Sequence, residues 1–138
     1  MRKDDCLFCK IAAGEIPSTT LYENDDFRVF FDINPASRGH CLIIPKQHYD
    51  TIFDLDGTSA ASLFTLATKV ARGLKAELNC EGMNLVQNNG TIAGQTVFHF
   101  HLHLIPRYTG DTVNVQWQPG EADMDELKAL AESVGSHI

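Results

Sequence analysis

The sequence predicts an α+β domain in which a five-stranded, mainly antiparallel sheet packs against one long helix, with short helices near the termini. Three observations predict this class: five short segments of strand composition, one long amphipathic segment, and short connections between most neighbouring strands. A chain of 138 residues can bury a core of its own. Because no repeat or low-complexity linker divides it, we expect one domain over residues 1–138.

The first half of the chain contains a short helix and three strands separated by clear turn signals. Gly14 and Pro17 end the helix, the run Asn24-Asp25-Asp26 suits a hairpin turn, and Pro45 ends the third strand. The predicted elements are a helix over residues 8–13 and strands over residues 20–23, 27–33 and 40–44.

The second half begins with the longest predicted helix, over residues 59–79, which Asp56 or Thr58 could cap. Its apolar residues recur every three or four positions: Leu63, Leu66, Ala67, Val70, Leu74 and Leu78. Strands over residues 83–87 and 97–105 follow, then a helix over residues 123–134. These elements complete a sheet that we expect to be an antiparallel meander.

Composition excludes several classes of function. The net charge of −7 and the pI near 5.2 argue against nucleic acid or an anionic membrane as the main partner. No apolar run is long enough to span a membrane, and the N-terminus does not resemble a secretory leader, so we expect a cytoplasmic protein. Four cysteines in a chain of this size do not indicate a disulfide scaffold.

The most informative segment is residues 97–105, where apolar and imidazole side chains alternate. On a strand, His99, His101 and His103 would share one face. The other face would carry Phe98, Phe100, Leu102 and Leu104 and pack against the long helix. A polar strand face usually uses threonine, lysine or glutamate, so three histidines in five residues indicate chemistry.

Two chemistries fit these histidines. Two of them could bind a catalytic zinc ion, or one could attack phosphorus directly, because neutral imidazole is a competent nucleophile near pH 7. The preceding runs Asn88-Asn89-Gly90 and Gly94-Gln95-Thr96 offer amide, hydroxyl and backbone N–H donors. Such donors suit a phosphate oxyanion better than a metal, which favours the nucleophile.

Four ordered motifs resemble the histidine-triad (HIT) nucleotide-binding superfamily, in its bacterial zinc-containing type. They are residues 30–35 (FFDINP), 39–48 (GHCLIIPKQH), 88–90 (NNG) and 94–105 (GQTVFHFHLHLI). The similarity covers residues 6–108, the expected core of the domain, and leaves residues 109–138 as a C-terminal tail. The resemblance implies a homodimer whose two sheets form one continuous ten-stranded sheet.

The resemblance also implies the roles of the catalytic residues. His101 would attack the α-phosphate of a purine nucleotide and form a nucleotidyl-histidine. A backbone carbonyl near His99 would hold the tautomer of His101. His103 would hydrogen-bond the phosphate and be oriented by His40.

Further residues would bind the substrate by the same resemblance. Phosphate contacts would come from Asn88, Gly94, Gln95 and Thr96. Asp32 would accept hydrogen bonds from the ribose hydroxyls, although the residues alone favour a strand-end aspartate facing water. The base would lie against Phe8, Ile11 and Phe30, which by residue type alone would be ordinary core.

Cys6 and Cys9 have the spacing of half a zinc site, of a redox pair, or of two unpaired thiols. A redox motif normally follows a strand, and none precedes Cys6. The resemblance completes the set with His48 and His99, which gives a Cys₂His₂ site without an open position and therefore a structural zinc ion.

The sequence thus predicts hydrolysis of nucleoside phosphoramidates or dinucleoside polyphosphates with release of a nucleoside monophosphate. Two other functions stay open at this point. One is a purine-nucleotide-binding regulatory module with little turnover, and the other is a zinc hydrolase that uses His99 and His101 as ligands.

Overall fold

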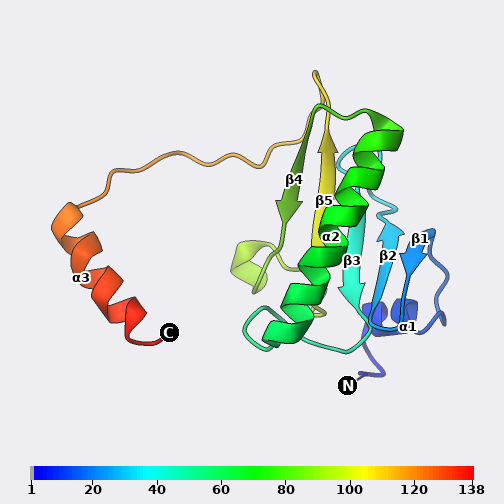
Figure 1. The fold of residues 1–138 in the computed structure, drawn as a ribbon, viewed down its shortest axis with the longest axis horizontal. Helices are drawn as coiled ribbons and strands as arrows, with labels where there is room; N and C mark the ends of the chain where they lie inside the picture. The colour runs from blue at the N-terminus through cyan, green and yellow to red at the C-terminus, as the bar shows by residue number, and fades with distance from the viewer. Residues whose placement is uncertain (1) are drawn as a thin grey trace.

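The computed structural model describes residues 2–138, which fold into one five-stranded sheet and three α-helices (Figure 1). The elements in chain order are α1 (Leu7–Ala12), β1 (Thr20–Glu23), β2 (Phe27–Phe31), β3 (Cys41–Pro45), α2 (Gly57–Leu78), β4 (Gly82–Val86), the 3₁₀ turn η1 (Thr91–Ala93), β5 (Leu102–Arg107) and α3 (Met124–Gly135). The predicted α+β class is confirmed. In this range, no helix is long and apolar enough to cross a membrane.

The strand order is β1-β2-β3-β5-β4, and every neighbouring pair is antiparallel. The expectation of a simple meander is therefore wrong, because β5 inserts between β3 and β4 although it follows both in the chain. Local patterns could not reveal this order, since the β3–β5 pairing joins segments separated by α2 and β4. The inserted strand places His103 opposite Leu42, in the middle of the sheet.

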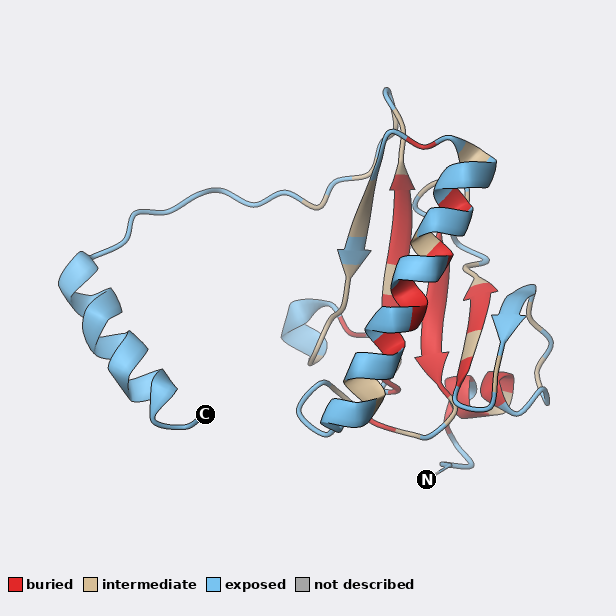
Figure 2. Cartoon of the chain, in the orientation of Figure 1, coloured by how far each residue is buried: buried red, intermediate tan, exposed pale blue. Residues whose placement is uncertain are grey.

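The two faces of the sheet pack against different helices. Along β3, Cys41 and Ile43 point into a core shared with α2, whereas Leu42 and Ile44 pack with residues of α1. This division follows from the two-residue period of a strand. Figure 2 shows the resulting band of buried residues along β2, β3 and β5. The outer strands β1 and β4 are much more exposed.

The long helix predicted from the apolar spacing is confirmed as α2. The Asp56 side chain accepts a hydrogen bond from the Ser59 backbone N–H at 2.6 Å and caps the first turn. Asn79 ends the helix in the left-handed conformation with φ of 50°. The apolar stripe is buried from Leu63 to Leu74, and Leu78 is partly buried against the same core.

The predicted strand over residues 97–105 is wrong in its first half, because β5 begins only at Leu102. Its pairing with β3 covers Leu102 to Leu104, and the backbone N–H of Phe100 donates instead to the Tyr49 carbonyl, outside the sheet. Phe100 still packs against the α2 core, but Phe98 is exposed rather than buried. The three histidines therefore do not share one strand face.

The chain after β5 leaves the domain as an extended segment and ends in α3, which lies well apart from the sheet beyond β4 (Figure 1). The Arg107 guanidinium fixes the start of this segment, with two hydrogen bonds of 2.8 Å to Asp111 and one of 2.8 Å to Asn84 of β4. Every residue of α3 is exposed, including its apolar side chains Met124, Leu127 and Leu130.

Candidate active site and metal centre

His101 is held with one ring nitrogen engaged and the other available. Its Nδ1 lies 2.7 Å from the carbonyl oxygen of His99. Because a carbonyl can only accept, Nδ1 carries the proton and donates it. The neutral ring therefore keeps an unprotonated Nε2 with a lone pair, as a nucleophile requires. The turn of the chain before β5 creates this contact between residues two positions apart.

His40 and His103 form a second pair whose tautomers follow from one backbone group. The Ala36 N–H donates to His40 Nδ1 at 2.9 Å, so a neutral His40 carries its proton on Nε2. That nitrogen lies 2.9 Å from His103 Nδ1 and donates to it. His103 is consequently protonated on Nε2, which makes this nitrogen a hydrogen-bond donor. We call His40, His101 and His103 the catalytic cluster, after the role that the sequence predicts for them.

Burial keeps the catalytic cluster neutral. It lowers the pKa of His103 to about 4, with the neighbouring His101 and His40 rings acting in the same direction. Burial also lowers the pKa of His101 and of His40, and the nearby Asp32 carboxylate opposes it in both cases. A neutral cluster at pH 7 is the state that the predicted attack by His101 and donation from His103 Nε2 would require.

The predicted base-binding residues form a wall beside His101. Phe8 and Phe30 meet edge to face at 5.7 Å between ring centroids, and the Phe8 ring lies 5.0 Å from the His101 ring. Ile11 packs in the same cluster between α1 and the sheet, and all three side chains are buried. All three side chains thus pack in the core, as their residue types favoured, and contact between them and a base stays a prediction.

The predicted phosphate and ribose contacts lie on two loops. Asp32 follows β2, and its Oδ1 accepts from the Asn34 N–H at 2.8 Å while its Oδ2 lies 3.7 Å from His40 Nε2. Gly94 follows η1 with φ of 96°, and a Cβ there would lie 3.4 Å from Nδ2 of Asn88. The Thr96 side chain is exposed. The conformation of Gly94 thus requires glycine and lets this loop close around Asn88.

Gln95 differs from the other residues of that loop because its side chain is almost fully buried, at 2% exposed. Its Oε1 accepts from the Gly90 N–H at 2.8 Å, and its Nε2 donates to the Asp50 and Val97 carbonyls at 2.8 and 3.1 Å. The side-chain amide is thus fully engaged with the backbone. The sequence suggested a phosphate contact, and nothing in its pattern pointed to this bracing position.

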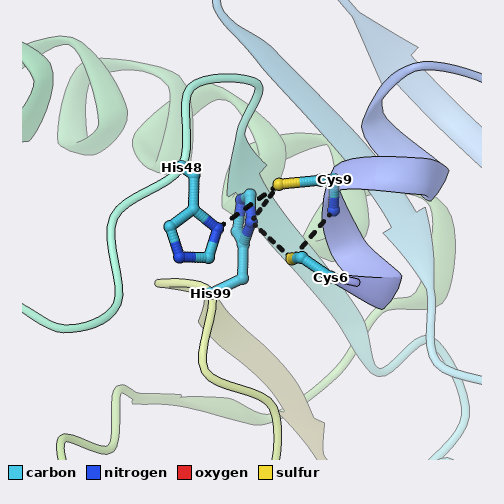
Figure 3. Close-up of side chains that lie close together, drawn as sticks. All are labelled: Cys6, Cys9, His48 and His99. Atoms are coloured by element: carbon cyan, nitrogen blue, oxygen red, sulfur yellow. Dashed lines mark hydrogen bonds between the residues drawn. The ribbon is translucent and has the colours of Figure 1, made fainter. Parts of the chain in front are cut away.

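The metal cluster consists of Cys6, Cys9, His48 and His99, whose side chains converge between α1, the loop after β3 and the segment before β5 (Figure 3). His99 Nδ1 lies 3.3 Å from the Cys6 sulfur and 3.4 Å from the Cys9 sulfur, and His48 Nδ1 lies 3.3 Å from the Cys9 sulfur. All four donor atoms lie within 4.8 Å of one another. The four predicted ligands therefore meet at one point.

These distances fit a tetrahedral zinc ion. Donors about 2.0–2.3 Å from the metal at tetrahedral angles lie roughly 3.3–3.8 Å apart. Burial raises the pKa of the Cys6 thiol, and a coordinated cation would reverse this by stabilising the thiolate. The Cys9 N–H already donates to the Cys6 sulfur at 3.2 Å. The donor set of two sulfurs and two imidazole nitrogens is typical of structural zinc.

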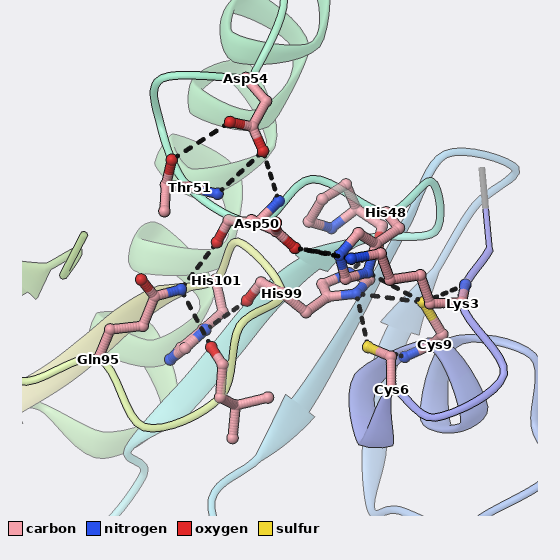
Figure 4. A network of polar contacts seen from close by, with 12 residues as sticks. Lys3, Cys6, Cys9, His48, Asp50, Thr51, Asp54, Gln95, His99 and His101 are labelled. Carbon is pink, nitrogen blue, oxygen red and sulfur yellow. Dashed lines mark hydrogen bonds and ion pairs between the residues drawn. The ribbon is translucent and has the colours of Figure 1, made fainter. Parts of the chain in front are cut away.

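The groups behind the two histidines fix the tautomers that a metal needs (Figure 4). His99 Nε2 lies 2.7 Å from the Pro45 carbonyl, so it carries the proton and Nδ1 faces the sulfurs unprotonated. His48 Nε2 donates to the Asp50 carboxylate at 2.6 Å, a contact that lowers the pKa of Asp50. Asp50 was not among the predicted site residues, although its position two residues after His48 was the available signal.

Asp32, His40 and His103 also bring three possible donor atoms within 4.8 Å of one another, but their hydrogen bonds argue against a metal there. Binding through Nε2 of a neutral His40 would move its proton to Nδ1. That nitrogen would then face the Ala36 N–H, donor against donor, at 2.9 Å. His40 and His103 therefore form a hydrogen-bonded pair, and the Asp32 carboxylate lies 3.7 Å from His40 Nε2 without being part of that hydrogen bond.

One hollow in the described residues lies away from this chemistry. It has a volume of about 830 Å³ and lies between α2 and β1–β2, with Leu66, Val70 and Leu74 in its lining. A smaller hollow of about 420 Å³ opens beside the metal cluster and is lined by Thr96, His48 and Asp50, among others. The histidine chemistry, rather than hollow size, defines the candidate site.

The family model described as the HIT domain matches residues 13–110 of the chain. The chain belongs to the HIT family. The match includes β1 to β5 and the catalytic cluster, and it begins after Cys6 and Cys9. The resemblance inferred from four motifs is thus confirmed.

Relatives extend the similarity to nearly the whole chain. An adenosine 5'-monophosphoramidase of Schizosaccharomyces pombe is 39% identical over 134 residues, covering 96% of this chain and 98% of its own length. The crystal structure of a HIT family protein from Bacillus anthracis is 43% identical with a TM-score of 0.93, covering 98% of both chains. A Zn-bound histidine triad family protein from Mycobacterium smegmatis is 34% identical with a TM-score of 0.76, covering 97% of this chain and 98% of its own. Hydrolase activity on nucleotides is therefore supported at the level of the family.

Proposed function

We propose that this HIT protein hydrolyses nucleoside phosphoramidates, or dinucleoside polyphosphates, through a covalent nucleotidyl intermediate on His101. The observation that carries the proposal is the hydrogen bond of 2.7 Å from His101 Nδ1 to the His99 carbonyl, which leaves Nε2 unprotonated beside His103. The similarity to a named adenosine 5'-monophosphoramidase favours an adenosine phosphoramidate as substrate.

The reaction proceeds in two displacements at phosphorus. The Nε2 lone pair of His101 forms a bond to the α-phosphorus, and the bond from phosphorus to the leaving amine or phosphate breaks, with its electron pair departing on the leaving group. A leaving amine takes up a proton from solvent, and the water that attacks in the second displacement returns one. Water then attacks the nucleotidyl-histidine, releases the nucleoside monophosphate and restores His101. His103 Nε2–H donates to the phosphate and stabilises the charge that develops on its oxygens.

The remaining groups bind the nucleotide. Asn88, Thr96 and the backbone around Gly94 supply phosphate contacts, and Asp32 accepts from the ribose hydroxyls. Gln95 belongs to the same loop, but its engaged amide suits it to bracing rather than to contact. Phe8, Phe30 and Ile11 form the apolar wall on which the base lies.

The metal cluster has a structural role in this proposal. Cys6, Cys9, His48 and His99 would hold a zinc ion that ties α1 to the segment preceding β5. The chemistry of the bound ion would be to fix four ligands without an open position for substrate or water. A catalytic zinc on His99 and His101 is disfavoured because His99 Nδ1 faces the cysteines and His101 Nδ1 is bound to a carbonyl.

The test is to incubate wild type, His101→Ala and His101→Gly with adenosine phosphoramidate and with a dinucleoside polyphosphate. We expect turnover to fall by about 10³-fold or more in both variants, and quenched wild type to carry a nucleotidyl mass adduct on His101. His137→Ala, at an exposed position near the C-terminus, is the matched control with unchanged turnover.

Unchanged turnover in the His101 variants would refute the proposed nucleophile. Purine nucleotide binding by wild type without turnover of either substrate would instead favour a binding or regulatory module. Loss of turnover on chelation, recovered with metal and without any His101 adduct, would favour a zinc hydrolase.

We also propose that the protein works as a homodimer with a continuous sheet. The exposed edge strands β1 and β4 and the detached, amphipathic α3 are the features that support a partner copy. Sedimentation of the full chain at micromolar concentration should give twice the mass of 15.3 kDa. A single species of monomer mass would exclude the dimer.

A further inference from the structure

We propose that Gln95 is a positioning residue that couples the metal cluster to the loop of residues 88–96. We call this loop the phosphate loop, a name that rests on the proposed function. The coupling runs from His48 through Asp50 to Gln95 (Figure 4). The metal cluster and the catalytic cluster do not explain how a loop rich in glycine and asparagine keeps one conformation, and this coupling does.

The first step is the closure of the phosphate loop by Gln95. Its backbone N–H donates to the Gly90 carbonyl at 3.1 Å, and its side-chain Oε1 accepts from the Gly90 N–H at 2.8 Å. Its Nε2 also donates to the Val97 carbonyl, just beyond the loop. One residue therefore ties both ends of the η1 turn together. Since Gly90 has φ of 94°, an otherwise mobile glycine is held at this point.

The second step joins the loop to the metal cluster through both parts of Asp50. The Asp50 carbonyl accepts from Gln95 Nε2 at 2.8 Å, while its carboxylate accepts from His48 Nε2 at 2.6 Å. A movement of His48 would therefore displace the residue on which Gln95 is anchored. A parallel contact of 2.7 Å, from the Ile52 N–H to the Asn89 side chain, joins the same two loops.

The third step is the burial of the Gln95 amide. Both Nε2 hydrogens and Oε1 have backbone partners, and the side chain is 2% exposed. Direct contact with a phosphate would require breaking at least one of these bonds, and a buried polar group without its partner is costly. The geometry thus fits a residue that acts through the loop and not on the substrate.

The decisive experiment compares Gln95→Met with Gln47→Met. Methionine is similar in length to glutamine and makes no such hydrogen bonds, and Gln47 is exposed next to His48. We expect Gln95→Met to speed amide hydrogen exchange at Gly90 and to lower kcat on adenosine phosphoramidate about tenfold, the scale of losses at supporting contacts. Zinc content should equal that of wild type, and Gln47→Met should match wild type throughout.

The coupling itself is tested by removing the metal. In wild type, chelation should speed exchange at Gly90, whereas in Gln95→Met it should add little further effect, because the connection is already broken. If Gln95→Met fails to fold, Gln95→Glu keeps the Oε1 acceptor for the Gly90 N–H but removes the Nε2 donors to the Asp50 and Val97 carbonyls, so chelation should again add little effect on exchange at Gly90.

Two results would overturn the proposal. One is a loss of kcat in Gln95→Met with unchanged exchange at Gly90, which would indicate direct contact with substrate. The other is exchange at Gly90 that chelation does not alter in wild type. Absence of turnover in wild type would refute the proposed function alone, because the exchange measurements require no substrate.

Discussion

The metal cluster and the catalytic cluster share one five-residue segment, which gives His99 to the first and His101 and His103 to the second, but they are organised in opposite ways. In the metal cluster, His48 and His99 each have one nitrogen bound to a supporting oxygen and the other aimed at the cysteine sulfurs. In the catalytic cluster, the hydrogen bonds leave Nε2 of His101 unprotonated and give Nε2 of His103 a proton. The two clusters therefore differ in the ring nitrogen that is not held by a supporting group. In the metal cluster it faces the cysteine sulfurs, and in His101 and His103 it is available to a substrate.

The largest expected effect comes from disrupting the metal cluster. Chelation of zinc, or Cys9→Ser, should lower the free energy of unfolding by about 4 kcal/mol, the stabilisation given by a ligand present at a thousand times its dissociation constant. For a domain of this size, Tm should fall by about 10 °C or more. Calorimetry with and without zinc measures it, and Cys80→Ser, a buried cysteine outside the cluster, is the comparison. An equal loss of Tm on chelating the Cys9→Ser protein would contradict a zinc site there.

The next largest effect is expected from substitutions in the catalytic cluster. His103→Asn keeps a polar atom near the position of Nδ1 for His40 but removes the Nε2 donor, so kcat should fall about 10²-fold with little change in nucleotide affinity. His103→Gln keeps a donor near Nε2 and should lose less. Steady-state kinetics and equilibrium binding of a nucleoside monophosphate separate the two quantities. A larger loss in His103→Gln than in His103→Asn would reverse the assigned roles of the two nitrogens.

A smaller effect appears in the pH dependence of stability. The pKa of His103 is lowered from 6.5 to about 4, so between these values the unfolded chain binds more protons than the native one. This contribution is complete above pH 6.5 and is lost as the pH falls toward 4. It amounts to at most about 2 kcal/mol between pH 6.5 and 5, and less where solvent reaches the half-buried ring.

Urea unfolding of wild type and His103→Asn across this pH range measures the difference, with His137→Asn as the exposed control. A wild-type curve parallel to that of His103→Asn would mean that burial does not keep the His103 ring neutral. Both proteins should be saturated with zinc, so that proton competition at the metal cluster cancels between them.

The smallest effect is expected from weakening the Asp50 hydrogen bond that supports the metal cluster. Asp50→Asn retains the backbone carbonyl that holds Gln95 but weakens the hydrogen bond to His48, so zinc affinity should fall about tenfold. Competition with a chromogenic chelator measures this, and Asp25→Asn, an exposed carboxylate in the turn between β1 and β2, provides the control. Equal zinc affinity in wild type and Asp50→Asn would show that the Asp50 carboxylate does not set the tautomer of His48.

Sequence predicted the elements well wherever local patterns decide them. Helix α2, its Asp56 cap and its apolar stripe follow from side-chain spacing and capping chemistry alone. The alternation over residues 97–105 misled because it is continuous in sequence, whereas the chain leaves the sheet before Leu102. Where the chain departs, His99 contacts Cys6 and Cys9, which lie 93 and 90 residues away in the sequence.

The candidate site was predictable only as a set of residues. The motifs named the four donors of the metal cluster, and spacing alone supplied only Cys6 and Cys9. The backbone groups that set the tautomers, the Ala36 N–H and the His99 and Pro45 carbonyls, leave no mark in the side-chain pattern. Gln95 shows the same limit, because its identity suggests a ligand contact and only its burial reveals its partners.

The insertion of β5 between β3 and β4 has a consequence for the order of folding. Until residues 102–107 join the sheet, β3 has one unpaired edge and β4 has no neighbour in it. The nascent chain therefore exposes strand edges that invite pairing between molecules. Because β5 carries His103 and follows directly on His99, the sheet, the metal cluster and the catalytic cluster are all complete only when this strand is in place.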